Sequence, residues 1–317
     1  MFSEDWSKHI KIDRKLILDQ LNQHFLEWDD KLTLRFFTIK PSGTQIIFNG
    51  LNSVLHTSLP HYIYGEDDIK RNGEMWAGLN ANGKFGLKNP KTDGKYGELL
   101  LFVLVESILG CKMVAHKIKS LTNIRDQIKG GDGIFIGDYQ FKSEKYPAYL
   151  IGESKVTTTL TKALKEALIS IERFHSAYFV NDFLDDELIV AKEFLSVTNT
   201  NLDELYDRLT PSSKIFKHQS LVHPILLMYS TSNFEKLQKD SASMEILENA
   251  ISESINGKEK EYLNKINKEL DNYSEIKKVY LDFFILPCKS VDEFRDLMYK
   301  KIHGVPYLYN VKENKVN

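Results

Sequence analysis

The sequence contains very little cysteine. Of its 317 residues only Cys111 and Cys288 are cysteines, and they are far apart without CxxC spacing. We therefore expect neither a disulfide framework nor a zinc site. We expect the protein to work in a reducing, cytoplasmic environment. The longest apolar run covers residues 99–105, far short of the roughly 20 residues that a membrane-spanning helix needs. The N-terminal residues carry charges of both signs and contain no continuous apolar stretch. We therefore expect no signal peptide.

An excess of one charge sign is also missing. Lysine and arginine number 42, aspartate and glutamate number 44, and the formal net charge is −2. The chain as a whole thus lacks the electrostatic signature of nucleic-acid binding, and any surface that binds phosphates must be local. The sequence also lacks the GxxxxGK[ST] loop of Walker-type ATPases. Any ATP-driven work would therefore have to come from another polypeptide.

Apolar periodicity predicts a chain of alternating helices and strands. We expect helices at residues 14–28, 97–110, 157–174 and 291–302, a charged helical region at 240–278, and strands at 31–39, 44–48, 112–119, 222–229 and 279–286, with a hairpin at 131–155. The helix at 97–110 is apolar on nearly every side, which is typical of a helix buried in a core. A polar, turn-rich stretch at 80–96 predicts a loop or domain boundary. We therefore expect an N-terminal α+β region, residues 1–90, and a main α/β domain, residues 91–317.

Charged residues stand at the ends of two apolar runs in the segment GDGIFIGDYQFKSEKYPAYLIGESK, residues 131–155. Glu153 and Lys155 are two apart, so in a strand their side chains lie on one face while Ser154 points to the other. Asp132 opens the preceding strand. If the two strands pair as an antiparallel hairpin, the start of the first lies opposite the end of the second. The pattern therefore predicts that Asp132 and Glu153 lie side by side.

These side chains suit metal-assisted chemistry. Two carboxylates in a partly buried place repel each other, and a hard divalent cation removes that repulsion. Mg²⁺ prefers oxygen ligands and takes one or two carboxylates together with waters and substrate phosphate; we expect that Mn²⁺ can substitute. Lys155 would orient or deprotonate the attacking water, or stabilise the charge of a developing phosphorane. The set predicts phosphodiester hydrolysis with Asp132 and Glu153 as metal ligands. Glycines nearby remove side-chain bulk and favour close approach of a ligand or backbone: Gly130, Gly131, Gly133 and Gly152.

The arrangement resembles the PD-(D/E)xK nuclease superfamily, in which a helix carrying an acid precedes three strands and a second helix follows. The resemblance implies a restriction-endonuclease-like core, with a mixed central sheet flanked by helices. Asp132 would be its metal acid, and Glu153 and Lys155 its ExK pair. Glu98 would be the acid of the first helix, with Glu106, about two turns later, as the alternative. A Gly-Asp-Gly sequence stands where the superfamily has proline-aspartate, a departure that this divergent superfamily tolerates.

A longer stretch is similar to a narrower family. The runs KYGELLLFVLVESILG and VTTTLTKALKEALISIERFH, together with the hairpin between them, resemble HamA, the nuclease subunit of the Hachiman antiphage defence system, over residues 95–175. The resemblance implies a DNA nuclease that is the effector subunit of a defence complex. Its partner would be a helicase, HamB, and activation would follow the sensing of invading or damaged DNA.

A local basic excess precedes the hairpin. Between Cys111 and Gly130 there are five basic residues and one acid, Asp126: Lys112, Lys117, Lys119, Arg125 and Lys129. We expect Lys117, Lys119 and Lys129 to contact DNA phosphates, with Lys162 on the polar side of the following helix extending the track. Phosphate contacts position a duplex without reading its sequence, so little base specificity is expected.

Each of these residues also has a purely structural interpretation. Glu153 and Lys155 can form a surface salt bridge, Asp132 is a common turn residue, and Glu98 suits the first turn of a helix. His175 ends a helix, where a cation suits the helix dipole, and needs no function. Two other functions remain open. One is a non-catalytic, DNA-gripping regulatory subunit of a helicase complex, and the other is a two-carboxylate hydrolase of small phosphate esters or nucleotides.

Overall fold

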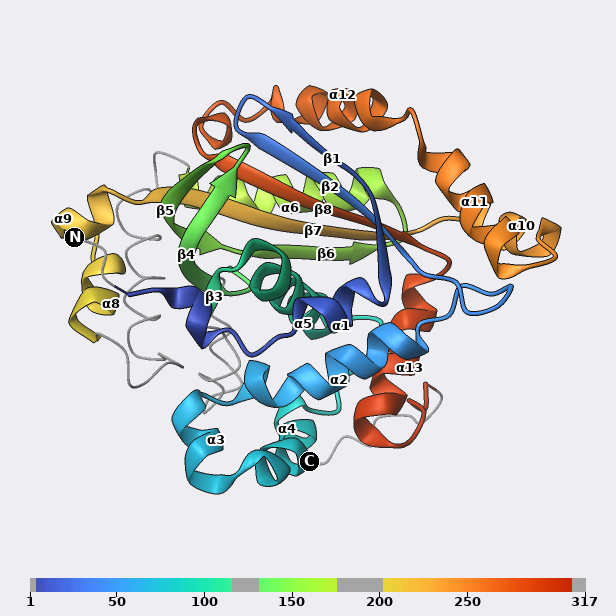
Figure 1. The fold of residues 1–317 in the computed structure, drawn as a ribbon, viewed down its shortest axis with the longest axis horizontal. Coiled ribbons are helices and arrows are strands. Elements are labelled where there is room, and N and C mark those ends of the chain that lie inside the picture. The colour runs from blue at the N-terminus through green and yellow to red at the C-terminus, as the bar shows by residue number, and fades with distance from the viewer. Residues whose placement is uncertain (1–3, 116–130, 176–201, 310–317) are drawn as a thin grey trace, which may run out of the picture.

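An eight-stranded sheet forms the centre of the molecule (Figure 1). The computed structural model describes residues 4–115, 131–175 and 202–309. The strands lie in the order β1, β2, β8, β7, β5, β4 and β3, and β6 follows β5 along β7. Neighbouring strands are antiparallel at the two ends of the sheet and parallel in the middle, which confirms the predicted mixed sheet of an α/β protein. The strands are Leu21–Asp29 (β1), Leu32–Ile39 (β2), Lys112–Ala115 (β3), Ile134–Phe141 (β4), Glu144–Ile151 (β5), Glu153–Thr157 (β6), Ser220–Ser230 (β7) and Tyr280–Cys288 (β8).

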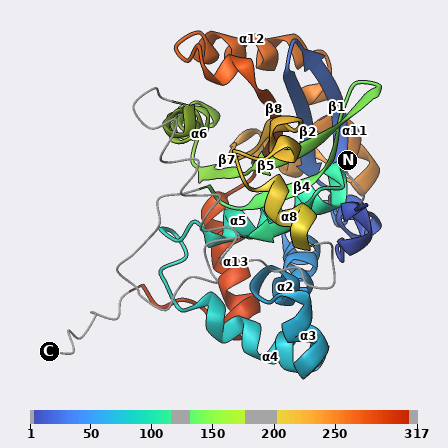
Figure 2. The same ribbon diagram turned by 90° about the vertical axis from the view of Figure 1, so that its left-hand side faces the viewer.

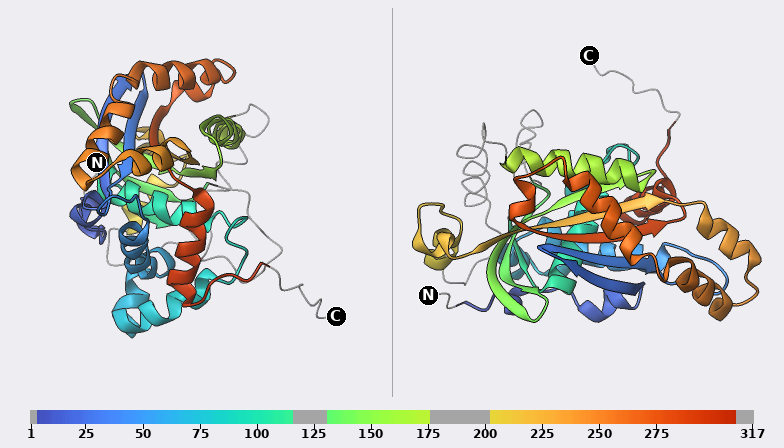
Figure 3. Two further views of the ribbon diagram at one scale, coloured as in Figure 1. Left: turned by 90° about the vertical axis from the view of Figure 1, so that its right-hand side faces the viewer. Right: turned by 90° about the horizontal axis from the view of Figure 1, so that it is seen from above.

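Helices flank the sheet, with α5 and α6 on opposite faces (Figure 2). Helices α2, α4 and α13 pack together below it (Figure 3). Within the described residues, no helix is both long and apolar enough to span a bilayer. The helices are Arg14–Leu18 (α1), Asn49–Ile63 (α2), Glu66–Asn72 (α3), Glu74–Phe85 (α4), Lys95–Leu104 (α5), Leu160–His175 (α6), Leu202–Arg208 (α8), Lys214–Lys217 (α9), Asn233–Asp240 (α10), Met244–Ile255 (α11), Glu259–Leu270 (α12) and Val291–His303 (α13).

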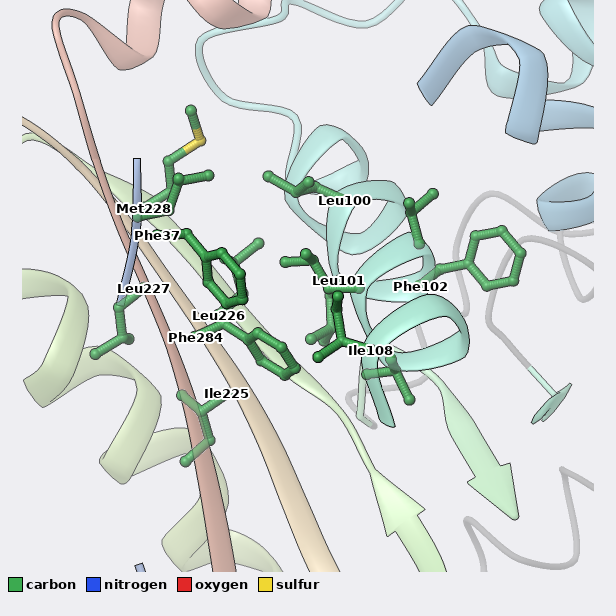
Figure 4. Close-up of a cluster of buried hydrophobic side chains, with 14 of the residues drawn as sticks. Phe37, Leu100, Leu101, Phe102, Ile108, Ile225, Leu226, Leu227, Met228 and Phe284 are labelled. Atoms are coloured by element: carbon green, nitrogen blue, oxygen red, sulfur yellow. The ribbon is translucent and has the colours of Figure 1, made fainter. Parts of the chain in front are cut away.

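The predicted core helix at residues 97–110 is confirmed. It consists of α5 followed by one π-helical segment, Val105–Leu109, and it ends at Gly110, whose φ of 68° is accessible without strain only to glycine. Figure 4 shows Leu101 and Ile108 of this segment directed at side chains of the sheet, among them Phe284. Because all its sides are covered, the helix tolerates a sequence with almost no polar face.

The predicted helix at residues 14–28 is wrong in its second half. Helix α1 ends at Leu18, and residues 21–29 form β1, which pairs antiparallel with β2. A bulge between Gln23 and Phe25 shifts the register of the pairing. The extra residue breaks the period-two alternation and leaves apolar residues at spacings that look helical. The pattern therefore hid a strand.

Two further predictions fail around α2 and α4. Residues 44–48 form no strand; an isolated bridge joins Ser42 to Gln45, and α2 begins at Asn49. The polar stretch at 80–96 is partly helical, because α4 extends to Phe85 and α5 begins at Lys95. Polar composition misled the prediction here, since a helix needs only one apolar face and that of α4 is narrow: Ala77, Ala81 and Phe85.

Most of the remaining predicted elements agree with the structure; of the strand predicted at 112–119, residues 112–115 form β3 and residues 116–119 lie outside the described residues. The strands predicted at 31–39, 222–229 and 279–286 are β2, β7 and β8, and the helices predicted at 157–174 and 291–302 are α6 and α13. Helices α11 and α12 span most of the charged region at 240–278, and α10 ends at its first residue. The division at residue 90 stays a prediction, although β1 and β2 from the first part join the same sheet as β8 from the second.

Candidate functional site

The hairpin brings the candidate residues to one open edge of the sheet. Strand β5 ends at Ile151, and β6 resumes after Gly152. Among the described strands, β6 pairs with β7 alone, so its other edge faces no strand. Asp132 lies beside this edge, because its backbone N–H donates to Gly152 O at 2.8 Å and Gly152 N donates to Gly133 O at 2.9 Å.

The Asp132 carboxylate contacts the strand that carries Glu153 and Lys155. Its Oδ2 accepts hydrogen bonds from the backbone N and the Oγ of Ser154, both at 2.7 Å. The sequence predicted that Asp132 lies beside Glu153, and the structure places its carboxylate on the next residue along the strand. Because the N–H and C=O of a strand residue point the same way, the Ser154 carbonyl is also directed toward this edge.

Glu153 and Lys155 share one face, as strand alternation predicted. Ser154 and Val156 face α5, since a Cβ added to Gly97 of that helix would lie 3.1 Å from Ser154 Oγ. The Glu153 and Lys155 side chains therefore lie on the opposite face, where Lys155 Nζ donates to Glu153 Oε1. Glu153 is buried, at 2% exposure, whereas the Lys155 side chain is 25% exposed. The pair is thus half-buried rather than a solvated surface bridge.

Glu98 lies on the α5 face of the same region. The buried Tyr62 hydroxyl of α2 donates to Glu98 Oε2 at 3.2 Å. Burial raises the pKa of Tyr62, and the negative charges of Glu98 and Asp132 raise it further. One tyrosine hydroxyl thus lies within the electrostatic reach of both acids.

Glu106, the alternative helix acid, lies in a different environment. Its Oε1 is 2.9 Å from Lys112 Nζ and accepts from the Met113 N–H at 3.1 Å. Burial raises the pKa of Glu106, although the neighbouring Lys112 charge opposes this. Glu106 is thus held by Lys112 and Met113, and the choice between the two helix acids stays a prediction.

The glycines around the acids make room for core side chains. A Cβ on Gly152 would lie 2.9 Å from Leu101 Cδ2, and a Cβ on Gly131 would lie 2.5 Å from Ile151 Cγ2. These distances are too short for carbon atoms, so any larger residue would push the strand away from its neighbours. These two glycines therefore allow close approach of core side chains and of the neighbouring backbone, which agrees with the backbone alternative of the prediction.

The predicted DNA contacts are only partly described. Lys117, Lys119 and Lys129 lie outside the described residues. Lys162 lies in the first turn of α6 with 59% of its side chain exposed, and its Nζ is 3.9 Å from Glu166 Oε1. Lys112, counted in the basic excess, is 5% exposed and paired with Glu106. Lys112 is therefore part of the core and is not available to phosphates.

Three contacts at the site had no counterpart in the sequence predictions. Ser154 binds Asp132, and Tyr62 binds Glu98 from a helix far away in the sequence. Arg295 of α13 donates from Nη2 to the Val156 carbonyl at 2.8 Å, two residues along β6 from Ser154. The last two contacts depend on how distant elements pack, so no local spacing links their residues.

His175, predicted to need no function, has a buried partner. Its Nε2 lies 2.8 Å from His223 Nε2, and His223 Nδ1 lies 3.0 Å from the Ile151 carbonyl oxygen. Burial, assisted by His175, lowers the pKa of His223 to about 3. His223 is therefore neutral in the folded protein at any ordinary pH.

Acid should destabilise the fold through His223. The ordinary histidine pKa is 6.5 and the folded value is about 3, so between them only the unfolded chain binds the proton. The free energy of unfolding then falls as the pH falls through this window, by about 2 kcal/mol between about pH 8 and about pH 5. Urea unfolding at a series of pH values measures this slope. The variant His223→Phe should show a smaller slope, and an equal slope in both proteins would contradict the assignment.

The described side chains at the site do not by themselves form a complete metal-binding site. Among the residues that the structure describes, no three His, Cys, Asp or Glu side chains are grouped so as to hold a metal ion. The donors that the site offers are the carboxylates of Asp132 and Glu153 and the backbone carbonyl of Ser154, which are all oxygen. Such a set fits Mg²⁺, which completes its coordination with water and substrate, better than it fits zinc.

Comparison with known proteins identifies the family of the chain. No curated protein matches the chain. The HamA family matches residues 15–302 of the 317, a span that runs from α1 through α13 and includes the whole candidate site. The chain therefore belongs to the HamA family and, through it, to Hachiman antiphage defence.

Proposed function

We propose that the protein is a Mg²⁺-dependent DNA nuclease, the effector subunit of an antiphage complex with a helicase. The observation that carries the proposal is the hydrogen bonding of Asp132 to Ser154, the residue between Glu153 and Lys155. It joins the acid of one strand to the acid-lysine pair of the next, at an edge that no described strand covers. Membership of the HamA family supports the setting in phage defence.

The order of elements supports a PD-(D/E)xK-type core. Helix α5 is followed by β3, β4 and β5, which pair antiparallel, and then by β6 and α6; β7 comes later in the chain and runs parallel to β5 and β6. The candidate residues lie on or next to the elements where the superfamily pattern expects them, with Gly152 dividing the third strand into β5 and β6. Glu98 is on α5, Asp132 precedes β4, and Glu153 and Lys155 are on β6.

The metal would be held by Asp132, Glu153 and the Ser154 carbonyl. These oxygens suit Mg²⁺, with Mn²⁺ as a substitute. Bound there, the ion would act as a Lewis acid on the scissile phosphate and lower the pKa of a coordinated water.

The chain's own residues would do the remaining work. Lys155, paired with Glu153, would orient the attacking water or stabilise the charge that develops on the phosphate. Ser154 holds the Asp132 carboxylate by two hydrogen bonds, which fixes its direction before substrate arrives. Glu98, held by Tyr62, would support the site from the α5 side.

DNA would be held by its phosphates, and the helicase would supply the motor. Lys162 is exposed near the start of α6, and the predicted contacts Lys117, Lys119 and Lys129 would extend the track. The sequence has no Walker-type loop, so translocation on DNA requires the partner.

A cleavage assay with a matched acid control tests the proposal. Plasmid and linear DNA would be incubated with the protein, with and without Mg²⁺, alone and together with the helicase and ATP. Asp132→Asn should abolish cleavage because the ligand charge is lost. Asp138→Asn, an exposed acid on β4 of the same hairpin, should cleave like the wild type.

The outcomes separate the candidate functions. Cleavage that needs Mg²⁺ and Asp132 supports the nuclease. DNA binding that is unaffected by Mg²⁺, with no cleavage even in the complex with ATP, would replace it with the DNA-gripping subunit. Hydrolysis of nucleotides in place of DNA would favour a small phosphate ester as substrate.

A further inference from the structure

The hydrogen-bond ladder beside the candidate site is interrupted by a proline. Strand β7 pairs with Leu150 of β5 through Val222 and with Glu153 of β6 through Ile225, without any change of register. Continuing this register between the two pairs places Ile151 beside His223 and Gly152 beside Pro224. The break between β5 and β6 thus falls opposite the proline.

Pro224 leaves the Ile151 carbonyl without a ladder donor. Gly152 uses its N–H and C=O on the side of residues 132 and 133, so the backbone groups of Ile151 point toward β7. In a parallel ladder, such a carbonyl accepts a hydrogen bond from the backbone N–H of the residue that follows its paired residue. Ile151 is paired with His223, so the donor position is the next residue along β7. That residue is Pro224, which has no N–H to donate. A buried carbonyl without a donor is costly, so another donor is needed.

The side chain of His223 supplies that donor. Its Nδ1 is 3.0 Å from Ile151 O, and because a carbonyl only accepts, Nδ1 must carry the proton. The neutral ring then accepts at Nε2, so His175, whose Nε2 is 2.8 Å away, must donate. The two rings are nearly perpendicular, at 80°. His175 at the end of α6 thereby fixes both the tautomer and the orientation of the His223 ring.

We propose that His223 is a positioning residue for the candidate catalytic strand. It replaces the missing Pro224 N–H and fixes the backbone of Ile151 at the junction with β6. This role rests on the proposed nuclease function. Two site residues meet at this junction: Asp132 bonds to Gly152 O, and Glu153 follows Gly152 in the chain. A displacement of the junction by about 1 Å would misplace both acids, which is enough to lower a catalytic rate by about 10²-fold.

Four variants distinguish the effect of losing the His223 hydrogen-bond donor from the effect of losing its ring. His223→Phe removes the donor and keeps the volume, and it should lower kcat for DNA cleavage by about 10- to 100-fold with little change in KM. His223→Asn places an amide N–H near the position of Nδ1 and should retain most of the activity. Pro224→Ala should cleave like the wild type. Adding Pro224→Ala to His223→Phe restores a backbone N–H to Ile151 and should recover most of the loss.

The rescue distinguishes positioning from general damage to the fold. If the double variant stays as inactive as His223→Phe, or if His223→Phe cleaves at the wild-type rate, the proposal is overturned. The urea midpoints of the same four proteins provide a readout independent of activity. Pro224→Ala should raise the midpoint of His223→Phe by more than it changes that of the wild type. If the wild type does not cleave DNA, the nuclease proposal fails, while equal effects of Pro224→Ala in both backgrounds would overturn the hydrogen-bond assignment itself.

Discussion

Replacing Lys155 with methionine should lower Mg²⁺-dependent DNA cleavage by roughly 10²–10⁴-fold. Methionine keeps the unbranched, apolar part of the side chain and removes the ammonium group that donates to Glu153. The quarter of the Lys155 side chain that is exposed allows it to meet a phosphate at the open edge of β6, whereas Glu153 is almost fully buried. Initial rates on plasmid DNA, with kcat and KM determined separately, measure the effect.

Two companion variants make this result specific. Lys155→Arg keeps the positive charge but cannot give up its proton. It should retain partial activity if Lys155 acts through its charge, and it should be as inactive as Lys155→Met if Lys155 acts as a base. Lys145→Met removes an exposed lysine from β5 of the same hairpin and should leave the rate unchanged. A wild-type rate for Lys155→Met would exclude Lys155 from the chemistry.

The loss should also be separable from a loss of fold. Lys155→Met leaves the buried Glu153 carboxylate without this ion-pair partner, which costs stability. Circular dichroism and urea unfolding of the variant would show whether the protein remains folded under assay conditions. Cleavage should then be compared only between proteins that are folded, so that a lower rate reports on the site.

The positions that could be predicted are those that lie within the single segment of residues 131–155. The faces of Glu153 and Lys155 follow from the period of two that every strand imposes. Asp132 could be placed near them because an antiparallel hairpin joins the start of one strand to the end of the next. These inferences needed only residues within one continuous segment. The fold class followed in the same way from the order of helices and strands.

The rest of the site depends on packing between distant segments. Tyr62 reaches Glu98 from α2, and Arg295 reaches Val156 from α13. Neither contact has a sequence spacing that could reveal it. The choice between Glu98 and Glu106 depends on how α5 is rotated, and Glu106 faces Lys112 in the core.

One contact did leave a signal in the sequence. A proline inside the predicted strand at residues 222–229 removes a ladder donor, so a central strand that contains one needs a local explanation. The histidine before it, His223, supplies the missing bond. In β1, by contrast, the bulge left no such mark, and the strand was predicted as a helix.

Replacing Asp282 with alanine should lower the free energy of unfolding by about 3–5 kcal/mol. Asp282 of β8 is fully buried, and its two carboxylate oxygens accept from Arg35 Nε at 2.8 Å and Nη2 at 3.0 Å. Burial alone would lower the pKa of Arg35, but the charge and hydrogen bonds of Asp282 raise it above its ordinary value. Arg35 thus stays charged, and alanine would leave that charge buried and uncompensated.

The same carboxylate also joins a third strand. Tyr139 of β4 donates to Asp282 Oδ2 at 2.9 Å, so its oxygen must accept from Thr33 Oγ1, which is 3.0 Å away. Strand β4 is separated from β8 by β5 and β7 in the sheet, and the long tyrosine side chain bridges that gap. The network therefore links the β2–β8 pair to the hairpin whose first strand is β4.

Urea unfolding of a set of variants separates the charge from the packing. Asp282→Asn keeps the shape and one acceptor oxygen, and it should cost less than Asp282→Ala because part of the hydrogen bonding survives. The double variant Arg35→Met with Asp282→Leu removes both charges and should recover most of the stability, since a buried ion pair is often replaced by apolar side chains at little cost. If the double variant is no more stable than Asp282→Ala, the cost lies in packing and hydrogen bonds. The buried guanidinium would then not be what makes Asp282 necessary.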